Sequence, residues 1–191
     1  SWSGRRFGGI CFGICHGAGD ARVGPFPNPA HGGQPMALTM DLPDESATLE
    51  VGAALGRALV AHPAFVTLAG DLGAGKTTLV RAALRALGYS GAVRSPTYTL
   101  IESYSFASLT VHHLDCYRLG GDDELDALGF RDLLESGASV LLEWPERVPE
   151  KARQADLRVT LTYSGHGRRL EALAKGARGE ALLLAWTAEI R

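Results

Sequence analysis

Residues 70–77, in the middle of the chain, have the types and spacing of a phosphate-binding loop. Their sequence, Gly-Asp-Leu-Gly-Ala-Gly-Lys-Thr, fits the pattern G-x-x-x-x-G-K-[ST]. In such a loop the glycines let backbone N–H groups face a phosphate, the ammonium of Lys76 reaches the terminal phosphates, and the hydroxyl of Thr77 reaches Mg²⁺. The pattern therefore predicts a site for a phosphorylated nucleotide and magnesium.

The sequence on both sides of this loop predicts the elements that would position it. Residues 65–69 are apolar and partly β-branched, which indicates a buried strand. Residues 76–87 carry apolar side chains at helical spacing, and Gly88 follows where a C-cap is expected. Strand, loop and helix in this order would bring a phosphate to the positive end of the helix dipole.

Two acidic residues, Asp115 and Glu143, are candidates for holding or orienting the hydrated magnesium ion. They lie toward the C-terminal ends of two apolar runs, residues 109–115 and 140–145, that predict strands. Ligands of parallel α/β sheets gather at the carboxyl ends of strands. Spacing alone does not rank the two acids, and either could instead be a surface acid that follows a strand.

Other polar and aromatic residues near these acids are further candidates. Thr97 and Thr99 could form a switch segment whose hydroxyls sense a γ-phosphate, or could belong to an exposed turn. Trp144 could stack near the nucleotide or pack in the core. One of His112 and His113 is expected to face the core and the other the site, with a structural role favoured for both.

Strand and helix patterns alternate along the rest of the chain and predict the fold class. They give a strand at 38–42, helices at 46–61 and 122–135, a loop turning into a strand at 95–104, and a hairpin of 157–163 and 169–175 followed by an apolar run at 181–186. This order predicts an α/β fold, a P-loop NTPase-like three-layer sandwich with a largely parallel or mixed central sheet and a β-rich C-terminal tail.

Composition narrows the class of protein further. The 191 residues are 46% hydrophobic and 21% charged, which suits one substantial core, and the net charge of −2 does not favour general attraction to nucleic acid. Residues 115–146 hold nine acidic and two basic side chains, whereas residues 147–191 hold nine basic and five acidic ones. Three cysteines do not make a disulfide framework, so a reducing cytoplasm is expected, and no apolar run has the length of a membrane span.

Residues 1–35 differ from the rest of the chain. They are rich in glycine and proline and show little strand or helix periodicity. We expect a disordered or non-native leader there, and a single P-loop domain over residues 36–191 that begins near Met36 or Met40.

The motifs together resemble the bacterial TsaE family, the ATPase component of the machinery that makes N6-threonylcarbamoyladenosine in tRNA. The resemblance covers about residues 41–165, and the matching segments are residues 43–45 with the start of the following helix, 70–78, 95–100, 113–119 and 142–145. The segments Ser-Pro-Thr-Tyr-Thr-Leu and His-x-Asp-x-Tyr-Arg-Leu make the match specific. Cys116 replaces an expected aliphatic residue, and residues 1–35 have no counterpart.

The resemblance implies a role for each matching residue. The phosphates would be wrapped by Leu72, Gly73, Ala74, Gly75, Lys76 and Thr77. Thr77 and Glu143 would hold Mg²⁺, and Asp115 would assist the metal or the attacking water.

The resemblance also implies residues at the edge of the site and a mode of action. Glu45 would lie at the nucleotide edge, and Thr97 and Thr99 would belong to a switch loop. The cofactors would be ATP and Mg²⁺, with hydrolysis slow alone and stimulated by partners. Those partners would be TsaD-like and TsaB-like proteins, with tRNA contacted indirectly, and the group transfer itself would be done by them.

Three other functions remain open at this point. A small-molecule kinase would need an arginine-bearing lid, but Arg118 and Arg131 are the basic residues of the central region. A nucleotide-gated binding module would change its affinity for a partner without hydrolysis. A direct RNA-binding protein is permitted by the basic tail, although no RNA-binding motif is present.

Overall fold

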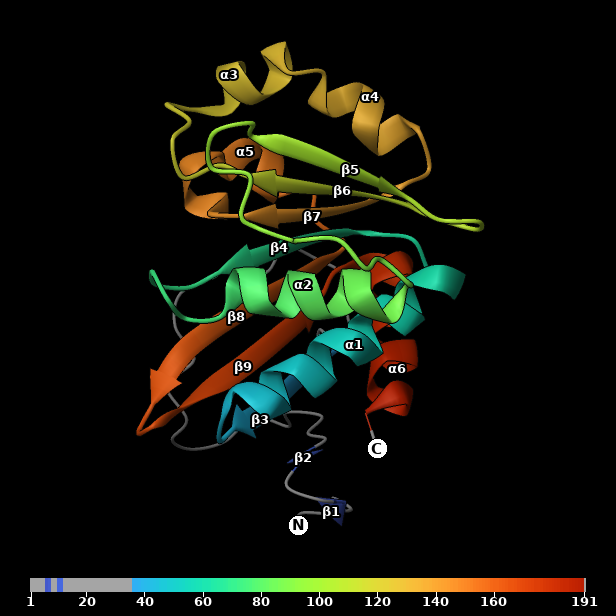
Figure 1. The fold of residues 1–191 in the computed structure, drawn as a ribbon, viewed down its shortest axis with the longest axis vertical. Coiled ribbons are helices and arrows are strands. Elements are labelled where there is room, and N and C mark those ends of the chain that lie inside the picture. Colours follow the sequence, from blue (N-terminus) through green and yellow to red (C-terminus); the bar gives the residue numbers. More distant parts are fainter. Residues whose placement is uncertain (1–5, 8–9, 12–35, 191) are drawn as a thin grey trace.

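The structure is a computed structural model that describes residues 6–7, 10–11 and 36–190 (Figure 1). The predicted leader, residues 1–35, lies outside the described part except for two short strands. The strands are β1 (Arg6–Phe7), β2 (Ile10–Cys11), β3 (Ala37–Leu42), β4 (Phe65–Ala69), β5 (Ile101–Ser105), β6 (Thr110–Asp115), β7 (Ser139–Glu143), β8 (Leu157–Ser164) and β9 (Gly167–Ala174).

These strands form one mixed sheet in the order β1-β2-β3-β9-β8-β4-β7-β6-β5. The four central strands β8, β4, β7 and β6 run parallel, and the remaining pairs are antiparallel. The carboxyl ends of β4, β6 and β7 therefore lie at one edge of the sheet. This arrangement confirms the predicted α/β class with a mixed central sheet.

Helices cover both faces of the sheet and complete three layers (Figure 1). They are α1 (Glu45–Ala61), α2 (Lys76–Ala86), α3 (Asp122–Ala127), α4 (Phe130–Glu135), α5 (Pro149–Ala152), α6 (Gly176–Glu189) and the 3-10 helix η1 (Pro145–Arg147). Helices α1, α2 and α6 share a core with one face, whereas α3 and α4 contribute to a second core on the other face.

Strand β4 shows why the sheet is buried on both sides. Its sequence, Phe-Val-Thr-Leu-Ala, is a continuous apolar run instead of an alternating one, as expected for a central parallel strand. Val66 and Leu68 join the core beneath α1 and α2, while Phe65 points to the other face and meets Phe130 of α4 edge-on, with ring centroids 5.4 Å apart. The loop that follows β4 thus starts from a rigid base.

Helix α1 fixes the position of α2. Asp44 caps α1 by accepting a hydrogen bond from the Ala47 N–H at 2.9 Å. Two glycines of α1 then face α2 closely, because a Cβ on Gly52 would lie 2.6 Å from the Leu79 carbonyl oxygen and one on Gly56 would lie 2.3 Å from that of Ala83. Larger side chains at these positions would push α2 away from α1.

The predicted strands and the helix at 76–87 are confirmed to within a few residues, but the single helix at 122–135 is wrong. The structure has two short helices there, separated by Gly129 with φ +81°. A residue with positive φ cannot continue a right-handed helix. Glycine adopts this conformation readily because it has no Cβ that would clash. The predicted hairpin is present as β8 and β9, and the apolar run at 181–186, for which no element was predicted, lies in α6.

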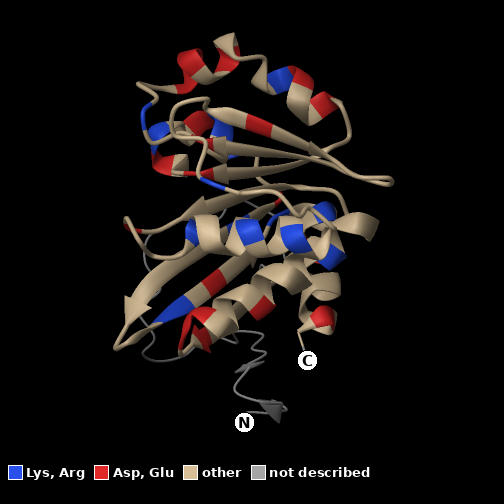
Figure 2. Ribbon diagram, viewed as in Figure 1, with Lys and Arg blue, Asp and Glu red and all other residues tan. Residues whose placement is uncertain are grey.

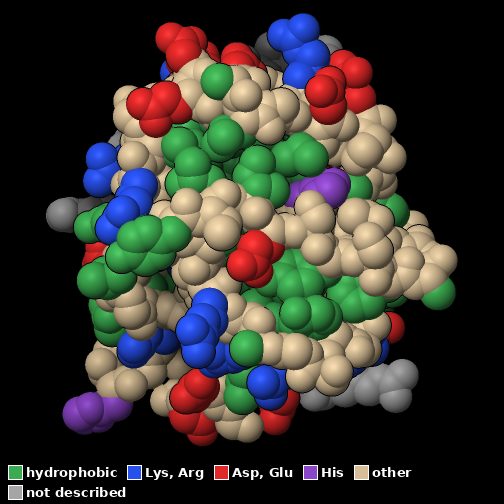
Figure 3. Space-filling model, turned by 45° about the horizontal axis from the view of Figure 1, so that its top comes forward, with side chains coloured by type: hydrophobic (Ala, Val, Ile, Leu, Met, Phe, Trp, Pro, Cys, Tyr) green, Lys and Arg blue, Asp and Glu red, His purple; other side chains and the backbone are tan. Residues whose placement is uncertain are grey.

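Charged side chains are unevenly distributed over these elements. Figure 2 shows acidic residues on α3, whose first turn carries three, and basic residues along α2. In Figure 3, where the end of the molecule with α3 and α4 comes forward, acidic side chains border an area of hydrophobic ones. None of the helices in the described part combines the length and apolar character needed to cross a membrane.

Candidate nucleotide-binding site

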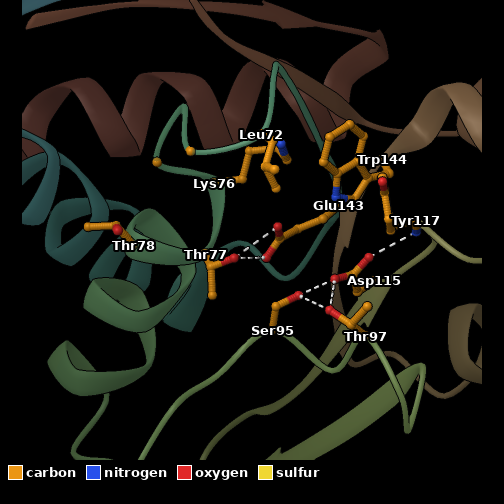
Figure 4. A pocket seen from close by; sticks show the side chains of 12 residues that line it. Leu72, Lys76, Thr77, Thr78, Ser95, Thr97, Asp115, Tyr117, Glu143 and Trp144 are labelled. Atoms are coloured by element: carbon orange, nitrogen blue, oxygen red, sulfur yellow. Dashed lines mark hydrogen bonds between the residues drawn. The ribbon is translucent and has the colours of Figure 1, made fainter.

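An open pocket of about 290 Å³ lies at the carboxyl ends of β4, β6 and β7 (Figure 4). Its walls come from the predicted phosphate loop and the start of α2, from the segment at residues 95–97, and from the ends of β6 and β7. These are segments far apart in the sequence that the parallel strand order brings to one edge of the sheet.

The phosphate loop adopts a conformation that needs glycine. Gly70 has φ +137°, and a Cβ there would lie 2.2 Å from the Leu161 carbonyl oxygen of β8. Gly75, with φ +109°, forms the N-cap of α2 and has no side chain to occupy the first turn. The first turn of α2 consequently keeps backbone N–H groups available for an anionic ligand.

Lys76 is buried and folds back onto its own loop. Its Nζ atom donates hydrogen bonds to the carbonyl oxygens of Gly70 at 2.5 Å and Asp71 at 3.0 Å, and lies 3.7 Å from the centroid of the Trp144 ring. Burial lowers the pKa of Lys76 below its usual 10.5, and the nearby carboxylate of Glu143 opposes that shift. The ammonium therefore borders the pocket with uncharged carbonyl partners that an anion could replace.

Thr77 and Glu143 meet directly inside the pocket (Figure 4). The Thr77 hydroxyl lies 2.9 Å from Oε1 and 3.0 Å from Oε2 of Glu143. Glu143 is buried at the end of β7, and its Oε1 also lies 2.8 Å from Nε2 of His113, a fully buried residue of β6. A hydroxyl and a carboxylate thus converge beside the first turn of α2.

Asp115 is buried at the end of β6 and is surrounded by donors. Its Oδ2 accepts hydrogen bonds from the hydroxyls of Ser95 and Thr97, the latter at 2.9 Å, and its Oδ1 accepts one from the Tyr117 N–H at 2.9 Å. Asp115 therefore ties the loop at residues 95–97 to the sheet. Ser95 and Tyr117 also line the pocket but are not among the predicted site residues, although the Ser-x-Thr spacing in the hydroxyl-rich segment at 95–100 was a usable signal for Ser95.

Trp144 forms one wall of the pocket. It has an uncommon backbone conformation for a residue other than glycine, with φ +62°, directly after Glu143. Its ring lies over Lys76 and packs against Tyr117, with ring centroids 4.9 Å apart. Trp144 thus lines the pocket and also packs against the second core, so it occupies both of the locations expected for it.

The β8–β9 hairpin holds the outer side of the phosphate loop. The Tyr163 hydroxyl donates to the Leu72 carbonyl oxygen at 2.9 Å, and Arg168 donates to that of Gly73 at 3.3 Å. The Arg168 guanidinium also stacks over the Tyr163 ring, 4.0 Å from its centroid. These residues are cross-strand partners, so the exact hairpin register was needed to find them.

Three of the predicted site residues, Glu45, Ala74 and Thr99, do not line the pocket. The side chain of Ala74 is fully buried in the core beneath α1 and α2. Glu45, in the first turn of α1, pairs with Arg81 of α2 at 3.4 Å, and Arg81 in turn contacts Thr78 at the pocket wall. Thr99 is exposed, whereas Thr97 lies inside. Cys116 faces the core, as expected.

A buried strand, a glycine loop, a helix beginning with Lys-Thr and a carboxylate at the end of a neighbouring parallel strand define a P-loop NTPase-like protein. The family model for "Threonylcarbamoyl adenosine biosynthesis protein TsaE" matches residues 42–170. The chain belongs to the TsaE family. This membership supports a role in threonylcarbamoyladenosine biosynthesis.

Individual relatives agree with this assignment. The tRNA threonylcarbamoyladenosine biosynthesis protein TsaE of Haemophilus influenzae is 37% identical over 155 residues, covering 79% of this chain and 98% of that protein. The protein of the same name from Bacillus subtilis is 36% identical over 118 residues, covering 61% and 73%. Among solved structures, Bacillus subtilis YdiB has a TM-score of 0.67 at 23% identity, covering 85% of this chain and 100% of that one, and shares the fold.

Proposed function

We propose that this protein is a Mg²⁺-dependent ATPase required for the N6-threonylcarbamoyladenosine modification of tRNA. It acts on a complex of TsaD-like and TsaB-like partner proteins and does not transfer the threonylcarbamoyl group itself. The observation that carries the proposal is the convergence of Lys76, Thr77 and Glu143 at the start of α2. The named relatives support the pathway.

The oxygen donors in the pocket fit Mg²⁺. This ion prefers oxygen ligands and is commonly held by one or two carboxylates together with substrate phosphates. The Thr77 hydroxyl and the Glu143 carboxylate, already within 3.0 Å of each other, are the groups that would hold it. A bound Mg²⁺ would supply charge neutralisation on the phosphate oxygens.

Nucleotide binding would use the loop and Lys76. The backbone N–H groups of residues 72–77 would surround the phosphates at the N-terminus of α2. Lys76 would exchange the carbonyl oxygens of Gly70 and Asp71 for phosphate oxygens, which are stronger partners because they are charged. Trp144 stands beside this position and would contact the bound nucleotide.

Hydrolysis by this chain alone would be slow. In the described part of the chain, Lys76 is the only Lys or Arg that lines the pocket. Asp115, the other carboxylate, already accepts three hydrogen bonds and is committed to the loop at residues 95–97. A site with positioning groups but little charge stabilisation for the transition state resembles those completed by an arginine from a partner.

The experiment that tests this proposal is multiple-turnover modification of tRNA in a reconstituted system. The full chain is combined with TsaD-like and TsaB-like proteins, tRNA, an activated threonylcarbamoyl donor and Mg-ATP. We expect turnover beyond one modified tRNA per partner complex with wild-type protein, and loss of it with Lys76→Ala or with a non-hydrolysable ATP analogue. Equal turnover with Lys76→Ala would remove ATP hydrolysis at this site from the function.

A further inference from the structure

His113 carries an interaction that the proposed function does not use. The residue is fully buried in β6, and its Nε2 lies 2.8 Å from Oε1 of Glu143 on the neighbouring strand. Its other ring nitrogen, Nδ1, is buried and has no hydrogen-bond partner. A carboxylate is an acceptor, so Nε2 carries the proton, and a second proton on Nδ1 would have no acceptor.

The register of the sheet explains why these two side chains meet. His113 pairs with Leu141 and Asp115 pairs with Glu143 on the parallel strands β6 and β7. Side chains two residues apart on a strand point to the same face. His113 and Glu143 therefore share the face that α2 covers, one step apart along the strands, with His113 deeper in the core.

We propose that His113 is a positioning residue that holds the Glu143 carboxylate in the orientation needed to bind Mg²⁺. This inference rests on the proposed function of the pocket. Thr77 has a single hydroxyl proton and can donate to only one carboxylate oxygen at a time. Once that hydroxyl turns toward a metal, the N–H of His113 is the donor that still fixes Oε1. Hydrogen bonds of this kind to metal-binding carboxylates typically change metal affinity by about 10- to 100-fold.

The neighbouring His112 provides a matched comparison. It is also a buried histidine of β6, but its ring bonds the Ser103 hydroxyl at 2.8 Å on the edge strand β5 and makes no contact with Glu143. A loss of packing or of β6 stability would follow from changes at either histidine. A loss of metal binding would follow only from changes at His113.

The test uses the full chain and measures the gain in ADP affinity that Mg²⁺ provides, by calorimetric titration in Mg²⁺ and in EDTA. His113→Gln keeps an N–H donor near the Nε2 position, whereas the shorter His113→Asn does not reach it. We expect His113→Asn to reduce the Mg²⁺-dependent gain about 10-fold and to leave affinity in EDTA within about twofold. His113→Gln should retain most of the gain, and His112→Gln should retain all of it.

A double variant tests whether His113 acts on metal binding through Glu143. In a Glu143→Gln background, His113→Asn should cause no further loss, because the carboxylate that it orients is gone. The inference is overturned if His113→Asn keeps the full Mg²⁺-dependent gain, or if the Gln and Asn variants lose it equally. Wild-type protein that gains no ADP affinity from Mg²⁺ would instead refute the proposed function of the pocket, so the two failures are distinguishable.

Discussion

Asp115 and Glu143 occupy paired positions on the adjacent parallel strands β6 and β7, and their carboxylates lie on the same face of the sheet. Their hydrogen bonds differ. Asp115 binds the hydroxyls of Ser95 and Thr97, whereas Glu143 binds the hydroxyl of Thr77. One carboxylate therefore anchors the loop at residues 95–97 and the other anchors the start of α2. Sequence spacing could not separate these two tasks.

The contact between Thr97 and Asp115 predicts different effects for the two threonines of this loop. Thr97→Val keeps the shape of the side chain but removes a hydrogen bond to a carboxylate, so we expect a loss of about 1–2 kcal/mol in the free energy of unfolding. Thr99→Val changes an exposed side chain outside the pocket and should cost less than about 0.5 kcal/mol. Urea denaturation of both variants tests this, and equal losses would contradict the anchoring role.

The position of Trp144 predicts a fluorescence signal for nucleotide binding. The Lys76 ammonium lies 3.7 Å from the Trp144 ring centroid, and it would move when phosphates bind. Of the other two tryptophans, Trp186 is fully buried against α1 and Trp2 lies outside the described residues. We expect Mg-ATP to change the emission of wild-type protein and of Trp2→Phe, but not of Trp144→Phe. A change that survives in Trp144→Phe would contradict this geometry.

The lowered pKa of Lys76 predicts how nucleotide affinity depends on pH. Phosphates bind the protonated ammonium, so protein that has lost this proton must take one up on binding. Because burial lowers the pKa of Lys76, affinity should begin to fall below pH 10.5 as pH rises. Calorimetry with ADP at increasing alkaline pH, in buffers of different ionisation enthalpy, should detect growing proton uptake.

Lys76→Arg serves as the control for this pH dependence, because a guanidinium stays charged throughout the range. If the variant binds ADP, its binding should show no proton uptake attributable to position 76. Wild-type affinity that stays constant through the alkaline range would contradict the assignment of Lys76 as the phosphate-binding cation.

The close packing of Gly70 in the phosphate loop predicts that adding a single methyl group there destabilises the protein. Gly70→Ala would bring a Cβ within 2.2 Å of the Leu161 carbonyl oxygen, in addition to the strain of φ +137°. We expect a loss of about 3 kcal/mol or more in unfolding free energy, together with loss of ADP binding. Gly165 also has positive φ, but a Cβ there would have no atom within 4 Å. Gly165→Ala should therefore lower the free energy of unfolding by only about 1 kcal/mol and keep ADP binding. Equal losses of unfolding free energy in the two variants would show that the close approach of Gly70 to β8 does not contribute to stability.

Local sequence patterns predicted the central elements because residues close together in the sequence determine the backbone structure of these elements. The apolar run of β4, the glycine loop and the helical spacing of α2 each specify backbone structure within a few residues. The same holds for the strands that end at Asp115 and Glu143. The fold class and the inner wall of the pocket could therefore be predicted from the sequence alone.

The remaining features depend on contacts between distant segments. The hairpin residues Tyr163 and Arg168 reach the phosphate loop only because β8 pairs with β4 and β9 returns beside it. Glu45 contacts Arg81 and does not line the pocket, and this contact depends on the close approach of α1 to α2 at Gly52 and Gly56. The break at Gly129 was hidden because the apolar pattern continues across it.

The proposed function requires that this pocket hydrolyses ATP with Mg²⁺ and that partner proteins stimulate the hydrolysis. Steady-state phosphate release by the full chain, alone and with the TsaD-like and TsaB-like proteins, tests it most directly. We predict slow release by wild-type protein alone, strong stimulation by active partners, strict dependence on Mg²⁺, and near-complete loss with Lys76→Ala and Glu143→Ala. Unstimulated release in the presence of active partners, or unchanged Mg²⁺-dependent release by Glu143→Ala, would contradict the proposed function.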